Sequence, residues 1–262
     1  MIITSEIGKN WITSEKEEDY LNNAKELILA SKNAGADLIK IQVHVSNDEL
    51  KKRSKEREEW IKRNEAITTD EFLKEIFDYA NSLDIEMFGT GMSTLAAKKL
   101  NPFVRRHKIS SADIVDIELL KYLKSTKKPI ILSTGMSTAK QINKAVEFLG
   151  EQIDFINYCV SLYPCPIYKI DFEKMVLMKY MYERVGFSDH SLSIDAPVLA
   201  VRMGAVAIEK HFTLNRNDFG PDHKVSLLPD EFKRMVELCK LAETDGESFE
   251  EEKQFWSKFR TK

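Results

Sequence analysis

The sequence has few cysteines, which excludes a fold held together by disulfides. The three cysteines are Cys159, Cys165 and Cys239, and no two of them stand in a CxxC spacing. Disulfide frameworks and cysteine-based zinc sites need more cysteines at characteristic spacings. We therefore expect three free thiols, as in a protein of the cytoplasm.

Long apolar runs and an excess of charge are also lacking. No run of about 18 apolar residues occurs, so no membrane span is expected. The N-terminal stretch MIITSEIGKNW has neither the basic start nor the long apolar core of a signal peptide. The 39 basic and 42 acidic residues nearly cancel, to a net charge of −3. This balance gives no reason to expect nucleic acid or an anionic membrane as a partner.

Glycine-rich nucleotide loops are missing as well. The segments GTGMS and STGMS match neither the GxGxxG pattern nor GxxxxGK followed by Ser or Thr. Those patterns are the ones that cradle dinucleotides and nucleotide phosphates. A dinucleotide- or nucleotide-binding loop of either kind is therefore not expected.

Short apolar runs are present along the whole chain. The 262 residues are 43% hydrophobic, enough for one large core, and barrels of about 250 residues are commonly single domains. Uninterrupted apolar runs are typical of strands that are covered on both faces. The expected strands are Ile2–Ile7, Asp37–Val43, Ile85–Gly89, Val104–Ile109, Pro129–Ser133, Ile153–Cys159, Val185–Asp189 and Ala205–Lys210.

Amphipathic segments alternate with these strands. A helical stripe runs from Tyr20 to Ser31, and Gly35 is expected to end that helix. Thr69 or Asp70 is expected to cap the next helix. Further helices are expected over 93–101, 115–124, 137–149, 172–183, 194–203 and 229–242.

Eight strands alternating with eight helices predict an α/β fold, a (β/α)8 TIM barrel. A doubly wound open sheet is the alternative. We expect one domain over residues 1–262, with 243–262 as a C-terminal helical extension. The strongly charged segment 48–67 is expected to be a solvated helix or flap rather than a binding patch, although in a barrel it would overhang the active face.

Polar residues gather where the expected strands end. In a barrel of this kind the chemistry takes place at the C-terminal ends of the strands. Each residue alone has a structural explanation, such as a helix cap or a solvated lysine. Buried charges are costly unless they are paired or liganded, so their convergence on one mouth predicts a functional site. The residues concerned are Glu6, Lys40, Thr90, Lys108, Ser111, Asp113, Ser133, Ser188, His190, Glu209 and His211.

The chemistry of this set predicts an anion site and a metal site. Two lysines with several hydroxyl groups suit a phosphate or a carboxylate. Two imidazoles with a carboxylate suit a divalent metal such as Mn²⁺ or Zn²⁺. Together they indicate carbon–carbon or phosphate chemistry on a small anion.

Seven motifs, in order from about residue 2 to 240, resemble the sialic acid synthase family: SEIGKNW, LIKIQ, HKISSAD, PIILSTGM, FSDHSLSIDAP, IEKHFTL and GPDHKVSLLPDEFKRMV. Members of that family condense phosphoenolpyruvate with a six-carbon amino sugar to give a nine-carbon 2-keto acid. The resemblance implies a (β/α)8 barrel, phosphoenolpyruvate and an amino-sugar acceptor as partners, and release of phosphate. It also implies a divalent metal, Mn²⁺ or Mg²⁺, as cofactor, and it is compatible with a homodimer.

The resemblance further implies roles at the matching positions. The metal ligands it implies are His190 and His211. The acidic residues it places near the sugar and the reacting atoms, which would be catalytic, are Glu6, Asp113, Glu209 and Asp222. The substrate-binding residues it implies are Asn10 and, for phosphoenolpyruvate, Lys40, Thr90, Lys108, Ser111, Ser133 and Ser188.

The sequence departs from the family at several points on the sugar side. Trp11 stands where the family motif EIGxNHxG has histidine, Ser161 where it often has asparagine, and Asp113 where it often has glutamate. The family's small C-terminal antifreeze-like domain is expected to be missing. Trp11 either stacks on a sugar face or packs beneath the charged segment. The anion and metal half is expected to be intact and the sugar half altered.

Two other functions compete with the synthase. One is a related metal-dependent barrel aldolase or synthase with a different acceptor. The other is a non-catalytic barrel that serves as a binding module, against which the intact histidines, lysines and Glu209 argue.

Overall fold

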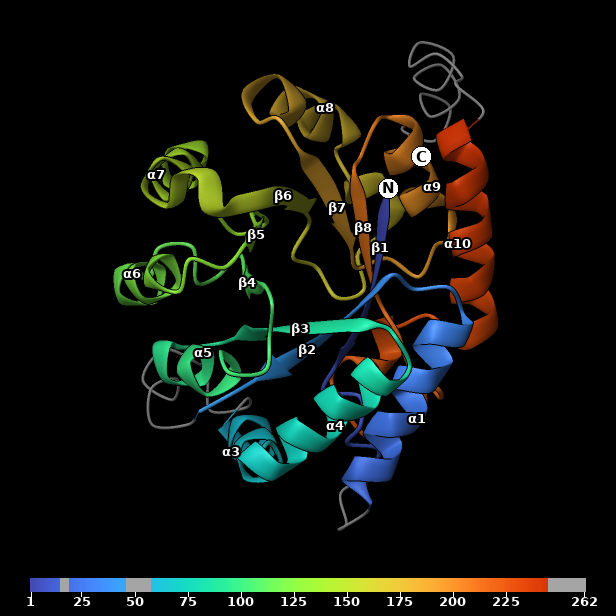
Figure 1. The fold of residues 1–262 in the computed structure, drawn as a ribbon. Coiled ribbons are helices and arrows are strands. Elements are labelled where there is room, and N and C mark those ends of the chain that lie inside the picture. The colour runs from blue at the N-terminus through green and yellow to red at the C-terminus, as the bar shows by residue number, and fades with distance from the viewer. Residues whose placement is uncertain (15–18, 46–57, 245–262) are drawn as a thin grey trace.

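The chain forms a closed barrel of eight parallel strands in a computed structural model (Figure 1). The structure describes residues 1–14, 19–45 and 58–244. Each strand pairs with the next along the chain, and β8 pairs with β1 to close the barrel. The strands are β1 (Ile2–Gly8), β2 (Leu38–Val43), β3 (Glu86–Gly91), β4 (His107–Ile109), β5 (Ile130–Ser133), β6 (Ile153–Cys159), β7 (Val185–Asp189) and β8 (Ala207–His211).

Helices surround the barrel. In Figure 1, α1 lies between α4 and α10, and α10 lies beside α9. The α-helices are α1 (Tyr20–Asn33), α3 (Glu58–Ile67), α4 (Asp70–Ser82), α5 (Thr94–Leu100), α6 (Ile117–Ser125), α7 (Ala139–Leu149), α8 (Phe172–Met181), α9 (Asp195–Arg202) and α10 (Pro229–Thr244). Short 3-10 helices are η2 (Gly150–Gln152), η3 (Ile167–Lys169) and η4 (His223–Val225). No helix in the described ranges is long and apolar enough to cross a bilayer.

The barrel predicted from the alternating pattern is confirmed, and the open sheet is wrong. The predictions made for the end of α1 and the start of α4 are also confirmed. Gly35 follows the last turn of α1 with φ +90°, a conformation that glycine adopts without strain. Thr69 caps α4, because its side chain accepts a hydrogen bond from the backbone N–H of Phe72 at 3.1 Å.

Strand β4 is shorter than predicted, since it begins at His107 rather than Val104. The preceding residues make other bonds. The Arg106 guanidinium bonds Glu86 at 2.7 Å and Asp154 at 2.6 Å. The carbonyl of Val104 accepts from Lys128 Nζ at 2.7 Å. Side-chain bonds therefore replace the strand ladder there.

Part of the charged segment 48–67 is helical. Residues 58–67 form α3, whereas 48–57 lie outside the described residues. Asn64 anchors this helix, because its side chain accepts from the backbone N–H of His44 at 3.0 Å and donates to the carbonyl of Gln42 at 3.3 Å. The predicted C-terminal extension also lies outside the described residues beyond Thr244.

The strand register determines which side chains share the barrel interior. Residues paired across parallel strands point to the same face. Glu6 pairs with Lys40 on one side and His211 on the other. Further pairs are Thr90 with Lys108 and Ser188 with Glu209. Charges that are far apart in the sequence are therefore brought together inside the barrel.

Candidate active site

Four charged side chains meet inside the barrel, and we call Glu6, Lys40, Lys108 and Glu209 the charged quartet. All four are buried. Lys40 Nζ contacts Glu6 Oε2, and Lys108 Nζ donates to Glu209 Oε1. Lys40 Nζ also lies 3.8 Å from Glu209 Oε1, which accepts a third contact from Ser188 Oγ at 3.0 Å. Two ammonium groups and two carboxylates thus compensate one another away from water, as buried charges require.

The quartet shifts the protonation of its own members. Burial, reinforced by Lys108, lowers the pKa of Lys40 to about 7, although Glu209 and Asp222 oppose the change. Burial would raise the pKa of Glu209, but the ammonium groups of Lys108 and Lys40 outweigh it and hold that pKa at about 2. Near neutral pH, Glu209 is therefore ionised and Lys40 is close to its titration midpoint. The site can take up a proton when an anion enters.

The two histidines lie next to each other beside the quartet. His190 follows β7, His211 ends β8, and their ring centroids are 5.7 Å apart. His190 Nδ1 lies 2.8 Å from the carbonyl oxygen of Val160, which can only accept, so Nδ1 carries the proton. His190 Nε2 accepts from the Tyr163 hydroxyl at 3.1 Å. The Nδ1 atom of His211 is buried and has no hydrogen-bond partner among the described residues.

Both imidazoles are held in their neutral form. Burial lowers the pKa of His190, and burial together with His190 and Lys40 lowers that of His211 to about 3. A neutral imidazole is the form that ligates metals. The nitrogens that could ligate a divalent ion are His190 Nε2, which now bonds the Tyr163 hydroxyl, and His211 Nδ1, which has no partner among the described residues. No three His, Cys, Asp or Glu side chains in the described ranges come together as a group that could hold a metal ion.

Gly8 brings a second pair of carboxylates together. A Cβ at Gly8 would lie 2.9 Å from Glu6 Oε1 and 3.3 Å from Asp222 Oδ2, and the residue has φ +49°. Gln42 donates to Glu6 Oε1 at 3.3 Å. Lys9 Nζ lies 3.9 Å from Asp222 Oδ2 and helps to lower the pKa of that carboxyl against the effect of burial. The loop that carries Asp222 therefore lies beside Glu6, on the side of the mouth where these two carboxylates meet Gly8.

Hydroxyl groups follow the strands next to Lys108. Ser111 Oγ and Ser161 Oγ are 3.3 Å apart. Ser133 Oγ, at the end of β5, is buried and has no hydrogen-bond partner in the part of the chain that the structure describes. A Cβ at Gly135 would lie 2.6 Å from Ser161 Oγ and 2.7 Å from Cys159 Sγ, so only glycine lets these two loops approach so closely. Such an arrangement suits the oxygens of a small anion.

Three residues near the predicted sugar side make contacts within the fold. Asn10 Nδ2 donates to the carbonyl of Phe212 at 2.8 Å and to Ser226 at 3.1 Å, so the amide joins two loops. The Asp113 carboxylate accepts from Ser110 Oγ at 2.6 Å within the turn after β4. Trp11 is 0% exposed and its ring centroid lies 5.9 Å from that of Phe72, so the indole packs in the core of this structure.

The sequence-based prediction missed several residues of the mouth. Tyr163 contacts His190 with ring centroids 4.2 Å apart and the rings tilted by 38°, and it meets His211 edge-on at 6.2 Å. Gly8 and Gln42 were also missed. Gly8 and Gln42 lie within motifs already singled out, so the motif was the available signal, whereas Tyr163 lies outside the seven motifs.

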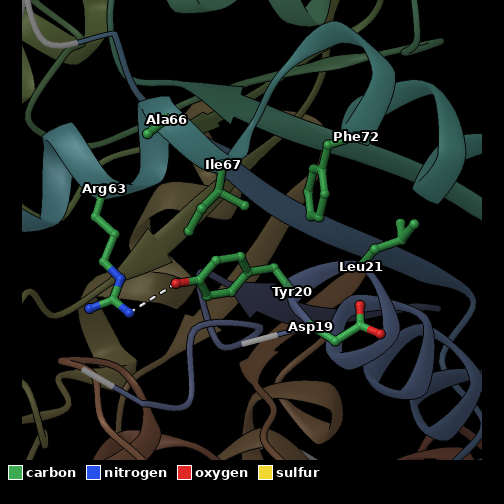
Figure 2. Close-up of a pocket in the computed structure, with 7 residues that line it drawn as sticks. All are labelled: Asp19, Tyr20, Leu21, Arg63, Ala66, Ile67 and Phe72. Atoms are coloured by element: carbon green, nitrogen blue, oxygen red, sulfur yellow. Dashed lines mark hydrogen bonds between the residues drawn. The ribbon is translucent and has the colours of Figure 1, made fainter. Parts of the chain in front are cut away.

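A cavity of about 480 Å³ lies apart from these residues, at the N-terminal end of α1. Figure 2 shows that the Arg63 guanidinium reaches the Tyr20 hydroxyl there, at 3.0 Å. No member of the charged quartet lines it. The lining residues are Asp19, Tyr20, Leu21, Arg63, Ala66, Ile67 and Phe72.

Fold and site together define a (β/α)8 barrel with a mouth built around paired charges and two neutral histidines. A family model described as the NeuB family matches residues 27–249, and the chain belongs to that family. An uncharacterized protein of Methanocaldococcus jannaschii is 38% identical over 248 residues, which cover 90% of this chain and 73% of that protein. The N,N'-diacetyllegionaminic acid synthase of Legionella pneumophila is 35% identical, covering 86% and 68% respectively.

A solved structure agrees over the full length. The N-acetylneuraminic acid (sialic acid) synthetase of Leptospira borgpetersenii, in complex with citrate, superposes with a TM-score of 0.85. It is 28% identical, and the match covers 100% of this chain and 93% of that one. The predicted resemblance to the sialic acid synthases is therefore confirmed.

Proposed function

We propose that the chain is an enzyme that condenses phosphoenolpyruvate with an amino-sugar aldehyde, giving a 2-keto sugar acid and phosphate. The observation that carries this proposal is the charged quartet beside two neutral histidines in one barrel mouth. The names of the Legionella synthase and the Leptospira synthetase support a sugar acid as the product. The citrate in the latter complex is itself a small polyanion.

The anion half would hold phosphoenolpyruvate. Lys40 and Lys108 are the cations available to its phosphate and carboxylate, because both point into the mouth. Thr90 and Ser188 adjoin these charges on neighbouring strands. Ser133 and Ser111 supply hydroxyl donors, and Ser133 Oγ has no other partner among the described residues. The anion would share the lysines with Glu6 and Glu209, so binding would change the buried ion pairs.

The reaction needs one new carbon–carbon bond and one broken carbon–oxygen bond. The methylene carbon of phosphoenolpyruvate joins the aldehyde carbon, water adds to the enol carbon, and the bond from that carbon to the phosphate oxygen breaks. One water proton ends on the new hydroxyl group and the other leaves with the phosphate. Glu209, whose carboxylate is held ionised, would orient that water as the acceptor of its proton, while the lysines would stabilise the departing phosphate.

A divalent ion, Mn²⁺ or Mg²⁺, held by His190 and His211 would supply a Lewis acid for the aldehyde oxygen. Glu6 and Asp222 face the same end of the mouth, where a Cβ at Gly8 would touch both carboxylates. Their negative charge suits the hydroxyl groups of an incoming sugar. Asp113 keeps its proposed role near the acceptor, with Ser110 holding its carboxylate.

Incubation with phosphoenolpyruvate, Mn²⁺ and a panel of amino sugars tests the proposal. We expect phosphate release that depends on one acceptor, together with a product whose mass equals phosphoenolpyruvate plus sugar plus water minus phosphoric acid. Lys108→Ala should abolish this release, whereas Lys128→Ala, at the other end of the barrel, should keep it. Absence of acceptor-dependent release across the panel would contradict the proposal.

A different acceptor is the second candidate, because two sugar-side residues serve the fold here. Asn10 bonds Phe212 and Ser226, and Trp11 is buried. A related aldolase or synthase would use the same anion half with another aldehyde. Extending the panel to aldehydes other than amino sugars separates the two, since only this candidate predicts turnover with them.

A further inference from the structure

Lys210 lies between two residues of the site but points the other way. Side chains alternate along a strand, so Glu209 and His211 face the barrel interior while Lys210 faces the surrounding helices. Its side chain is nevertheless 0% exposed. An ammonium group removed from water in this way requires a complete set of partners.

Those partners all come from one short segment, residues 189–193. Lys210 Nζ donates to the Asp189 carboxylate, to the carbonyl of Ser191 at 2.6 Å and to the carbonyl of Ser193 at 3.0 Å. The three donors of a lysine are thereby used. Asp189 in turn accepts from the backbone N–H and the hydroxyl of Ser191, each at 2.9 Å. Lys210 therefore holds the segment 189–193 at Asp189, Ser191 and Ser193.

His190 lies inside this fixed segment. Asp189 and Lys210 are direct register partners on β7 and β8, and a histidine directly follows each of them in the sequence. The ion pair therefore lies behind the barrel wall that presents both imidazoles. On the inner side, the bond from Nδ1 to Val160 sets the ring orientation of His190.

We infer that Asp189 and Lys210 are a positioning pair for His190. The pair holds the backbone of 189–193, and that backbone holds the imidazole against Val160 and 5.7 Å from His211. Fold stability alone does not require an ion pair at this place, because apolar residues of similar volume often serve as well. The consequence for metal affinity rests on the proposed function, whereas the position of the ring does not.

Three variants test the pair. Lys210→Met removes the ammonium group. The double variant Asp189→Asn with Lys210→Met removes both charges of the pair. Lys128→Met is the matched control, because Lys128 Nζ also donates to two backbone carbonyls, those of Asn101 at 2.5 Å and Val104 at 2.7 Å. That lysine precedes β5, at the opposite end of the barrel. All three variants lose hydrogen bonds from a lysine to backbone carbonyls. Only the two Lys210 variants lose the bonds to the segment 189–193 that carries His190.

The first measurement is the imidazole N–H signal of His190 in nitrogen-15 NMR. The chain has five histidines, so the signal can be assigned by its loss in His190→Ala. We expect it to broaden and to exchange with solvent at least tenfold faster in both Lys210 variants and to stay unchanged in Lys128→Met. A variant that only loses thermal stability would keep the width and the exchange rate of the His190 N–H signal.

The second measurement is Mn²⁺ affinity, by titration followed with electron paramagnetic resonance. Groups that orient a metal-binding histidine typically change affinity about 10- to 100-fold when they are removed, and we expect that loss in the Lys210 variants only. Wild-type protein that binds no Mn²⁺ would defeat the metal part of the proposed function, while the NMR comparison still decides the positioning pair.

An unchanged His190 signal in folded Lys210→Met or in the double variant overturns the inference. Should neither variant fold, Asp189→Asn alone replaces them, because it keeps the shape of the side chain and removes only the charge that Lys210 contacts. Faster exchange of the His190 proton is expected there too, to a smaller extent. A signal identical to that of the wild type in this mild variant would equally overturn the pair.

Discussion

Glu6 and Lys40 are register partners on β1 and β2, and their carboxylate and ammonium meet inside the barrel. Lys108 also has an internal carboxylate partner, because its ammonium contacts Glu209 although β4 and β8 are not neighbouring strands. A site that is neutral when empty must change its ion pairs or its protonation when an anion binds. This constraint leads to a pH dependence.

We predict that phosphoenolpyruvate binds less tightly as pH rises above 7. Burial lowers the pKa of Lys40 to about 7 in the free protein, and a bound anion favours the ammonium form, which raises that pKa. The binding form is therefore complete below pH 7 and is lost as pH rises, with up to about a tenfold loss of affinity for each pH unit. Calorimetry from pH 6 to 9, in two buffers of different ionisation enthalpy, measures the affinity and the proton uptake.

Lys40→Met is the control for that prediction. It should bind the anion weakly and with little change between pH 7 and 9, because the titrating group is gone. The same slope in wild type and variant would assign the pH dependence to another group.

Glu209→Gln should reduce kcat far more than Asp113→Asn. The Glu209 carboxylate contacts Lys108 and Ser188 and is held ionised, and a positioned acid or base contributes about 10²- to 10⁴-fold to a rate. Asp113 bonds Ser110 in the turn after β4, so a smaller effect is expected there. Steady-state rates of phosphate release, with circular dichroism to verify folding, compare the two. Equal losses in the two variants would contradict the assignment of the water-activating role to Glu209.

His211→Ala should lower the divalent-metal content of the purified protein. The His211 Nδ1 atom is buried without a hydrogen-bond partner among the described residues, and both imidazoles are neutral near pH 7 because of burial. His223→Ala is the control, since that buried histidine bonds Thr213 at 2.7 Å and the carbonyl of Ile12 at 3.1 Å instead. Elemental analysis after dialysis against Mn²⁺ gives the result. Equal metal content in His211→Ala and wild type would remove the metal site from the proposal.

The sequence predicted the barrel and the location of its mouth for definite physical reasons. Strands buried on both faces are continuous apolar runs, and these can be found without knowledge of their neighbours. Once a barrel is inferred, the C-terminal strand ends become the active face. Glu6, Lys40, Lys108 and Glu209 were identified by that reasoning, and the register brings them together.

What the sequence could not predict is the direction of side chains just beyond a strand. Asn10 and Trp11 follow Glu6 within one motif, and all three were candidates for the mouth. The register shifts between Glu6 and Gly8, and Gly8 has φ +49°, so the chain turns there. Glu6 stays inside the barrel, whereas Asn10 and Trp11 go to loop and core contacts. No local pattern in a single sequence reveals such a turn.

Trp11→Ala should destabilise the fold without a selective effect on the acceptor. The indole is fully buried, its ring centroid is 5.9 Å from that of Phe72 on α4, and the Trp11 carbonyl accepts from Asn23 at 3.1 Å. Truncation of a buried tryptophan costs about 3–5 kcal/mol of unfolding free energy, because it leaves a cavity between β1, α1 and α4. Urea unfolding measures this loss, and Trp11→Phe should recover a large part of it.

The kinetic comparison separates packing from sugar binding at Trp11. A residue that only packs should leave the acceptor KM and the phosphoenolpyruvate KM of the folded protein unchanged or shifted in proportion, since neither ligand touches it. Trp60→Ala is the control, because Trp60 on α3 stacks on Phe219 at 4.8 Å and is partly exposed, so its loss should cost less stability. A raised acceptor KM alone, with unfolding free energy intact, would return Trp11 to the sugar site and would require the loop after β1 to open when the acceptor binds.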